Sequence, residues 1–341
     1  MLADVRTLTL TPRPVFDSVD ELLGGATERR PFLTSDSKSG SGFERVVIDG
    51  APHILKHVHV DDDWTMRFCG DERNNPLQVW RSGLMDVVPS HVEHGVVGVA
   101  GGLGRDGLGA AILMRDLSAE LVPEGDAPLA LEQHRGYLDT MAALGAATWG
   151  WVDDIGMVDI DHRWSWFSDA NIADERDRGW PNPVPKIAAE GWERFAALAP
   201  APLVDQLHDL RNDPRPLVDA LATSPRCFIH GDWKLGNVGT AADGRTVLID
   251  WTYPGSAPIG HDLGWYLALN RARLPESKED AIEALRSSLE AHGVDTAGWF
   301  EHQVAVCLLG TLVEFGWEKA LGDESELAWW CDRAQEGAGR L

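Results

Sequence analysis

Hydrophobic and polar positions alternate in the first third of the chain, and their spacing changes to that of helices afterwards. Asp49-Gly50 separates two of the early apolar runs and favours a tight hairpin turn. Apolar residues at helical spacing predict one helix at 76–87. The alternating runs predict strands at 43–48, 52–60, 96–100 and 109–114.

From about residue 129 onward the pattern is mostly helical, with one β-like interruption at 226–251. Helices are predicted at 129–148, 186–198, 202–210, 276–291 and 299–321. We therefore expect an α+β fold, in which a small antiparallel sheet precedes a larger, mainly helical part. A chain of 341 residues is long enough for two such lobes, and the change of pattern places their boundary near 115–123.

Acidic residues outnumber basic ones by 54 to 30, which gives a formal charge of −24. A field of this sign opposes binding to nucleic acid and to anionic membranes, and it would help to attract a cationic substrate. An acidic surface can also serve solubility alone, so both explanations of the charge stay open. The four Cys residues are far apart and indicate neither a disulfide framework nor a zinc site. With no signal-peptide pattern and no apolar stretch of membrane length, we expect a cytoplasmic protein.

A loop rich in polar side chains follows a short apolar run in the second part of the chain. The run is Cys227-Phe-Ile, and the loop carries His230, Asp232, Lys234 and Asn237. Asp232 lies at the mouth of this loop, where a carboxylate can accept a proton from an attacking hydroxyl.

A hairpin directly after the loop should bring two oxygen-bearing side chains together. Asp243-Gly244 lies between short apolar runs at 238–240 and 246–249, which predicts the turn. Asn237 precedes the first strand and Asp250 follows the second, so they should be separated by roughly the 5 Å of paired strands. An amide oxygen and a carboxylate are hard ligands suited to Mg²⁺.

His230-Gly-Asp232, with Asn237 five residues after the aspartate, resembles the H-G-D-x-x-x-x-N catalytic loop of aminoglycoside phosphotransferases and related small-molecule kinases. Ile249-Asp-Trp resembles their second metal-binding motif. The resemblance implies a two-lobed protein-kinase-like fold and a reaction that requires ATP and Mg²⁺. It also implies roles: Asp232 as catalytic base, His230 as a brace of the loop, and Asn237 and Asp250 as metal ligands.

Three further residues near these motifs bear on the resemblance. Lys234 lies two residues after Asp232, as the catalytic-loop lysine does in serine/threonine protein kinases, and by that similarity would contact the γ-phosphate. A surface lysine in a turn is the alternative. Asp262 is similar to the family's later aspartate that hydrogen-bonds the catalytic loop. Thr252 departs from many relatives, which carry an acidic residue there, so a further metal or substrate contact at this position stays open.

The strand that ends in Lys56 is similar to the family's strand lysine, which pairs with the α- and β-phosphates of the nucleotide. An exposed strand lysine is the alternative reading. The family pattern requires a helical carboxylate to pair with this lysine. Glu72 is the candidate, and Glu93 is a second possibility.

The resemblance assigns two other segments to the nucleotide. The loop at 35–42, which includes Ser41 and Gly42, would place backbone N–H groups over the phosphates, although such a loop also suits a flexible linker. The segment at 112–117 would join the lobes and bond adenine through its backbone. Its contacting residues would be Met114, Asp116 and Leu117.

These expectations combine into one hypothesis. Residues 1–117 would form a nucleotide-binding N-lobe, and residues 118–341 a catalytic and substrate-binding C-lobe. The enzyme would move the γ-phosphate of ATP, or of GTP, to a hydroxyl of a small polar molecule such as an amino sugar or aminoglycoside. Two alternatives stay open: a kinase for Ser or Thr in a peptide, which Lys234 favours, and a catalytically silent pseudokinase that acts as a binding module.

Several other patterns have plainer explanations. The stretch from Gly102 to Gly107 fits G-x-G-x-x-G, but a short β-like run follows it, which favours a hairpin turn over a dinucleotide site. His59 precedes a run of aspartates, where a solvated strand end is favoured over a metal site. Trp233 and Trp251 flank the motifs and are candidates for cleft walls, with core packing as the alternative.

Overall fold

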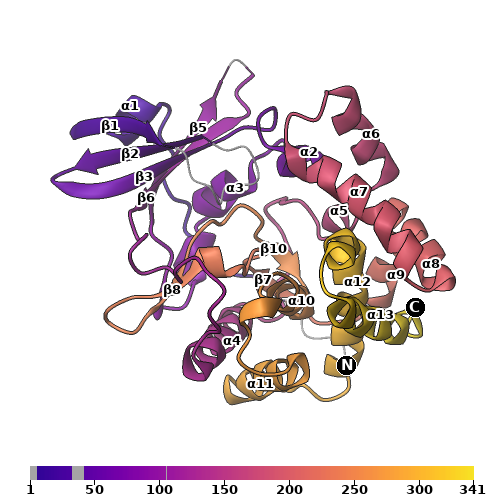
Figure 1. Cartoon of the computed structure of the whole chain (residues 1–341). Coiled ribbons are helices and arrows are strands. Elements are labelled where there is room, and N and C mark those ends of the chain that lie inside the picture. The colour runs from indigo at the N-terminus through magenta and orange to yellow at the C-terminus, as the bar shows by residue number, and fades with distance from the viewer. Residues whose placement is uncertain (1–5, 33–41, 105) are drawn as a thin grey trace.

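The computed structural model describes residues 6–32, 42–104 and 106–341 of the chain. A five-stranded antiparallel sheet, in the order β1-β2-β3-β6-β5, forms one part of the molecule, and helices make up most of the larger part (Figure 1). The α+β architecture expected from the pattern is confirmed. The strands of the sheet are β1 (Ala26–Phe32), β2 (Gly42–Ile48), β3 (Ala51–Val58), β5 (Val96–Leu103) and β6 (Gly109–Arg115).

Two predicted hairpins organise this sheet. Ile48 of β2 pairs with Ala51 of β3, and the turn between them uses positive φ angles at Asp49 and Gly50. Leu103 of β5 pairs with Gly109 of β6, so the glycine-rich stretch is a hairpin connection and not a dinucleotide site. One face of the sheet buries Val46, Leu55 and Leu113 together with Leu22 of the short helix α1 (Val19–Leu22). β1 is mostly exposed, and its alternation was too weak to predict it.

The single helix predicted at 76–87 is wrong, because the chain breaks at Gly83. Helix α3 (Asn75–Ser82) ends there, and a 3₁₀ turn, η1 (Leu84–Val87), follows. Gly83 has a φ of 84°, and a side chain at this position would meet the Thr11 carbonyl oxygen at 2.2 Å. Gly83 thus ends the helix in the left-handed conformation that glycine favours, a signal that periodicity alone does not show. The close approach of the N-terminal segment leaves no room for a side chain there.

The larger part is built around α12, which is buried along most of its length and packs against α7, α10 and α13. The predicted helical stretches correspond to α4, α7, α8, α11 and α12, whereas the others were not predicted. The bounds are α4 (Leu131–Ala147), α5 (Asp161–Trp164), α6 (Asp169–Asp177), α7 (Pro183–Leu198), α8 (Ala201–Asn212), α9 (Arg215–Ala220), α10 (Ile259–Leu269), η3 (Arg271–Arg273), α11 (Lys278–Ala291), α12 (Phe300–Leu321) and α13 (Glu324–Ala338). None of the described helices has the length and apolar character needed to cross a membrane.

Short strands lie between the sheet and the helices. The predicted hairpin at 238–249 is confirmed, since Val238 pairs with Leu248 in antiparallel register. A short strand from the first part of the chain runs parallel to this hairpin, and β10 pairs with β7. These strands are β4 (Val92–Glu93), β7 (Cys227–Ile229), β8 (Val238–Thr240), β9 (Thr246–Leu248) and β10 (Gly255–Ala257), with η2 (Leu235–Asn237) before β8.

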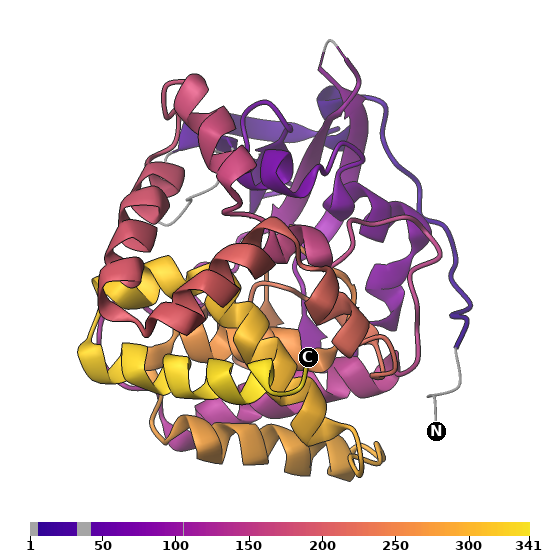
Figure 2. The same cartoon turned by 90° about the vertical axis from the view of Figure 1, so that its right-hand side faces the viewer.

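An extended N-terminal segment connects the sheet to the helical part. Figure 2 shows it in indigo, running from the sheet along the side of the helices. Phe16 forms a bridge with Ala100 of β5, and Arg6 forms one with Trp151 next to α4. The two parts of the molecule are thus joined by more than the segment at 115–123. The boundary predicted there stays a prediction.

Helix α2 (Trp64–Cys69) supplies a second connection, because it follows the strand β3 in sequence but packs on α5 and pairs with α6. Arg67 pairs with Glu175 of α6 at 2.6 Å, and its guanidinium also donates to the Val60 and Asp61 carbonyls. The Trp64 ring lies 5.7 Å from that of Trp166. Glu175 is almost fully buried, so its charge depends on Arg67 for compensation.

We predict that Glu175→Gln lowers the free energy of unfolding by about 3 kcal/mol, because it leaves Arg67 without its buried counter-ion. The matched control is Glu190→Gln, which removes an exposed pair with Lys186 and should change the free energy by less than about 0.5 kcal/mol. Urea unfolding followed by tryptophan fluorescence measures both. Equal effects of the two substitutions would contradict the proposed contribution of the α2 contact.

Candidate active site

The loop at 230–237 follows β7 and is largely buried without strand pairing of its own, so its buried N–H groups need side-chain acceptors. Asp262, in the first turn of α10, supplies them. It accepts the backbone N–H of His230 at 3.0 Å and of Gly231 at 2.8 Å, and the indole N–H of Trp233 at 2.7 Å. The prediction that Asp262 hydrogen-bonds this loop is confirmed.

The other end of α10 holds the same loop. The side-chain amide of Asn270 donates to the Trp233 carbonyl at 2.8 Å, and its oxygen accepts the N–H of Leu235 at 2.9 Å. No motif in the sequence indicated Asn270. Trp233 is fully buried, so the expectation that it lines a cleft is wrong and its alternative, core packing, is correct.

Asp232 is buried, and each of its carboxylate oxygens accepts one hydrogen bond. Trp265 donates its indole N–H to Oδ1, and Asn237 donates its amide to Oδ2, both at 2.8 Å. Burial raises the pKa of Asp232, the charge of Lys234 lowers it, and the charge of Asp250 raises it further. The sequence reading missed Trp265. Its position three residues after Asp262, on the same face of a helix, is the signal that would have identified it.

His230 connects the loop to the strand that precedes Asp250. The Asp232 N–H donates to its Nδ1 at 3.2 Å, so the ring proton lies on Nε2, which faces the Ile249 carbonyl at 3.0 Å. Burial lowers the pKa of this imidazole to about 4. The side chain is therefore a neutral imidazole that links two segments.

Asp250 and Lys56 form the second polar centre. Lys56 Nζ donates to Asp250 Oδ1 at 2.7 Å and to Thr252 Oγ1 at 2.8 Å. Burial acts to raise the pKa of Asp250, but the charges of Lys56 and Lys234 outweigh it and hold that pKa below its usual value. The Ile249 N–H donates to the Asn237 carbonyl at 2.9 Å, so the hairpin places Asn237 beside Asp250 as its pattern predicted.

The prediction that Glu72 or Glu93 pairs with Lys56 is wrong. Glu72 is exposed in the turn after α2, and Glu93 pairs with Arg115 and, at 2.7 Å, with Arg245. Helix α3, which lies next to Lys56, carries no acidic residue. Lys56 therefore pairs with Asp250, which is 194 positions away in sequence and beyond the reach of a helix-pattern argument.

A pocket lies between the sheet and the Asp250-Trp251 segment. Lys56 and Met114 line it together with Asp250, so the structure brings three residues predicted for nucleotide and metal binding to one place. Trp251 lines the pocket, in agreement with its predicted place in a cleft wall.

The other residues predicted for the nucleotide are not among those that line this pocket. The Asp116 N–H donates to the Pro52 carbonyl, and Leu117 accepts the N–H of Glu120. Gly42 begins β2, and Ser41 lies outside the described residues. The roles given to these residues and to Lys234 stay predictions.

The oxygen atoms at the hairpin fit a hard divalent cation. Asn237 turns its amide N–H toward Asp232, which leaves its Oδ1 for another partner, and Lys56 contacts one oxygen of the Asp250 carboxylate. An amide oxygen beside a carboxylate is a donor set that Mg²⁺ prefers. A second group, His59 with Asp61 and Asp106, lies largely exposed at the end of β3, as expected of a solvated strand end.

The geometry agrees with what comparison to known proteins finds. A model described as the phosphotransferase enzyme family matches residues 78–297. The choline kinase LicA from Streptococcus pneumoniae is similar over 95% of this chain and 96% of its own, with 11% identity and a TM-score of 0.50. A spectinomycin phosphotransferase solved with ADP and spectinomycin is similar over 93% and 92%, with 13% identity and a TM-score of 0.48. An aminopropanol kinase is similar over 91% and 90%, with 12% identity and a TM-score of 0.49. No curated protein sequence matches. At such identities the first likeness shows the fold, which is the two-lobed kinase-like fold expected above.

We predict that His230 makes stability fall in acid. Its pKa is about 4 in the folded chain and near 6.5 when unfolded, so the unfolded chain binds the extra proton first as the pH falls. The free energy of unfolding should therefore decline between pH 6.5 and 4, by roughly 1.4 kcal/mol per pH unit. Urea unfolding of the wild type and His230→Gln at several pH values isolates this contribution, since other histidines are common to both. Parallel pH curves would contradict it.

Proposed function

The chain belongs to the phosphotransferase enzyme family, and from this premise we propose that it moves the γ-phosphate of ATP to a hydroxyl of a small polar molecule, such as an amino sugar or aminoglycoside. The observation that carries the proposal is the placement of Asp232. Its carboxylate is fixed by Asn237 and Trp265, and the Lys56–Asp250 pair lines the neighbouring pocket. A fixed carboxylate beside a phosphate site is what a kinase of this family needs.

Asp232 would accept or orient the proton of the acceptor hydroxyl. Its two hydrogen bonds hold the carboxylate in one orientation, which supports a positioning role, and its raised pKa favours proton uptake. Most of the rate enhancement in phosphoryl transfer comes from such positioning and from electrostatics. Lys234 would lie toward the γ-phosphate, since its charge already acts on both Asp232 and Asp250.

The nucleotide would occupy the pocket under the sheet, with Lys56 on its phosphates and the segment at 114–117 on its base. Asn237 and Asp250 would hold Mg²⁺, which supplies positive charge to the phosphates when it is bound. We assign residues 1–117 to the nucleotide and residues 118–341 to catalysis and the acceptor. The net charge of −24 supports a cationic acceptor.

We predict that Asp232→Asn reduces turnover at least about 100-fold, because it removes the proton acceptor, while Mg·ATP binding changes less than about twofold. The assay measures ATP consumption with a panel of amino sugars, aminoglycosides, hydroxylated amines and Ser/Thr peptides. Asp209→Asn, exposed on α8, is the matched control and should keep wild-type turnover.

Full activity of Asp232→Asn would contradict the role of this residue. Turnover of peptides alone would favour the peptide-kinase alternative. A wild-type chain that fails to bind nucleotide would favour a binding module without kinase activity.

The metal assignment has its own test. Asp250→Ala should weaken Mg·ATP binding at least about tenfold, because it removes a carboxylate ligand, and should abolish the gain in ATP affinity that Mg²⁺ gives the wild type. Asp243→Ala, in the exposed turn of the same hairpin, is the matched control. Calorimetric titration of ATP with and without Mg²⁺ measures both. An Asp250→Ala variant with unchanged Mg²⁺ dependence would refute the assignment.

A further inference from the structure

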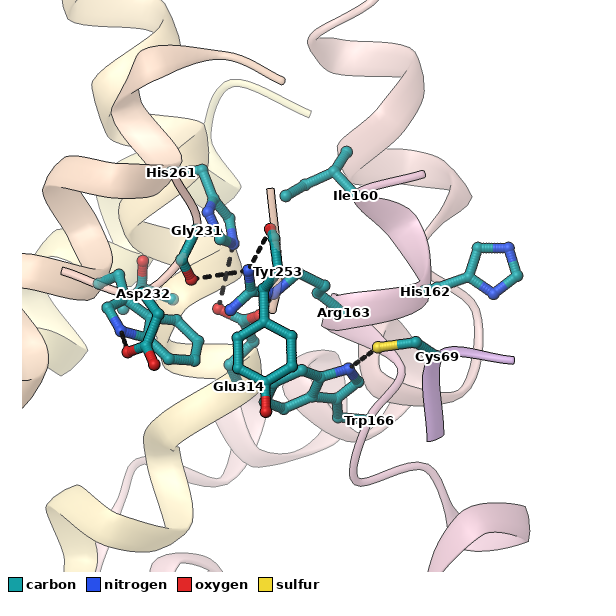
Figure 3. A network of polar contacts seen from close by, with 12 residues as sticks. Cys69, Ile160, His162, Arg163, Trp166, Gly231, Asp232, Tyr253, His261 and Glu314 are labelled. Atoms are coloured by element: carbon teal, nitrogen blue, oxygen red, sulfur yellow. Dashed lines mark hydrogen bonds and ion pairs between the residues drawn. The ribbon is translucent and has the colours of Figure 1, made fainter. Parts of the chain in front are cut away.

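Arg163 of α5 is a buried cation that reaches two segments of the active site. Its Nη1 donates to the Gly231 carbonyl at 2.8 Å, and the Tyr253 carbonyl lies 3.5 Å from the same atom. Gly231 directly precedes Asp232, and Tyr253 lies three residues after Asp250. Figure 3 shows the guanidinium between these two segments, with Asp232 on the far side of Gly231.

Three aromatic rings surround the guanidinium group. Its central carbon lies 4.2 Å from the ring centre of Trp265, 4.9 Å from that of Trp166 and 5.1 Å from that of Tyr253. Trp265 is also the residue that donates its indole N–H to Asp232. Arg163 therefore contacts both the backbone before Asp232 and the ring that holds its carboxylate, and stacking on the cation restricts that ring.

The peptide group between Gly231 and Asp232 has little room to move. Gly231 has a φ of 81°, and a side chain there would lie 2.1 Å from the Tyr253 carbonyl oxygen and 2.6 Å from Arg163 Nη1. Only glycine permits this approach, which brings the two active-site segments against the guanidinium. Rotation of this peptide group would break the 2.8 Å bond and move Asp232.

The charge of Arg163 is balanced from the opposite side. Glu314 of α12 lies 3.5 Å from its Nε, and His261 of α10 lies 3.5 Å from the other oxygen of Glu314. All three side chains are buried. A buried ion pair contributes little net stability compared with apolar residues of similar size, so stability alone is a weak reason for this arrangement.

We propose that Arg163 is a positioning residue for phosphoryl transfer: it fixes the Gly231–Asp232 peptide group and the Trp265 indole, and through them the orientation of the Asp232 carboxylate. The inference rests on the function proposed above for Asp232. It assigns no contact between Arg163 and the substrate or the nucleotide. The turnover number should therefore depend on Arg163, whereas nucleotide affinity should not.

The test uses variants that keep the buried charge balanced. Arg163→Met alone would leave Glu314 uncompensated and could prevent folding, so the main variant is the double substitution R163M/E314Q, with E314Q alone beside it. Arg163→Lys keeps the charge and one nitrogen that can donate, but loses the planar group that stacks between the rings. Arg211→Met is the matched control, because Arg211 is also buried, stacks on Trp192 and pairs with Asp169 away from the site.

Two measurements on the full chain decide the proposal. Hydrogen exchange by mass spectrometry, without substrate, should show the amides of residues 230–232 exchanging at least tenfold faster in R163M/E314Q than in the wild type, E314Q or R211M. With an acceptor from the panel above, kcat should fall at least tenfold in R163M/E314Q and partly recover in R163K, while the Kd for Mg·ATP stays within twofold.

Loop exchange equal to that of R211M, or an unchanged kcat, would overturn the positioning role. A general loss of protection across the chain would overturn it as well, since it would indicate a structural role only. A wild-type chain that turns over none of the acceptors would count against the proposed function. The exchange measurement would then still decide whether Arg163 fixes the loop.

Discussion

Asp262 accepts three N–H groups from a buried loop that has no strand to pair with, and the rest of the site depends on this constraint. Buried backbone groups without partners would destabilise any irregular loop, so helix α10 has to lie where its carboxylate can reach them. The same helix carries Trp265 one turn further, and that indole fixes the carboxylate of Asp232. One helix thus sets both the path of the loop and the direction of its central side chain.

The parts of this site that could be predicted from the sequence are those in which neighbours in the chain are neighbours in space. Asp243-Gly244 predicted a hairpin, and the hairpin placed Asn237 beside Asp250 without further information. The partner of Lys56 could not be found in this way, because α3 offers no carboxylate and the actual partner lies 194 positions away. Likewise, the close approach of the Thr11 carbonyl to Gly83 could not be predicted from the helix pattern, because Thr11 is distant in sequence.

The buried charges of the site are balanced across distant segments. Lys56 offsets Asp250, and Arg163 offsets Glu314, although the chain as a whole carries a charge of −24. In each pair the cation comes from an early segment and the carboxylate from a later one. Because an unpaired buried ion destabilises strongly, these pairs favour one relative placement of the segments that carry them. The Arg67–Glu175 pair likewise favours one placement of α2 relative to α6.

The segment from Asp250 to Tyr253 is where these two sets of contacts meet. Asp250 adopts a φ of 64°, a left-handed conformation that costs a non-glycine residue about 1 kcal/mol or more. On one side the Asp250 and Thr252 side chains accept hydrogen bonds from Lys56. On the other side the Tyr253 carbonyl faces Arg163. The strained turn persists because contacts from both sides offset its cost. The two ends of this short segment are therefore held by separate contacts, Lys56 on the side of the pocket and Arg163 on the side of the loop that carries Asp232.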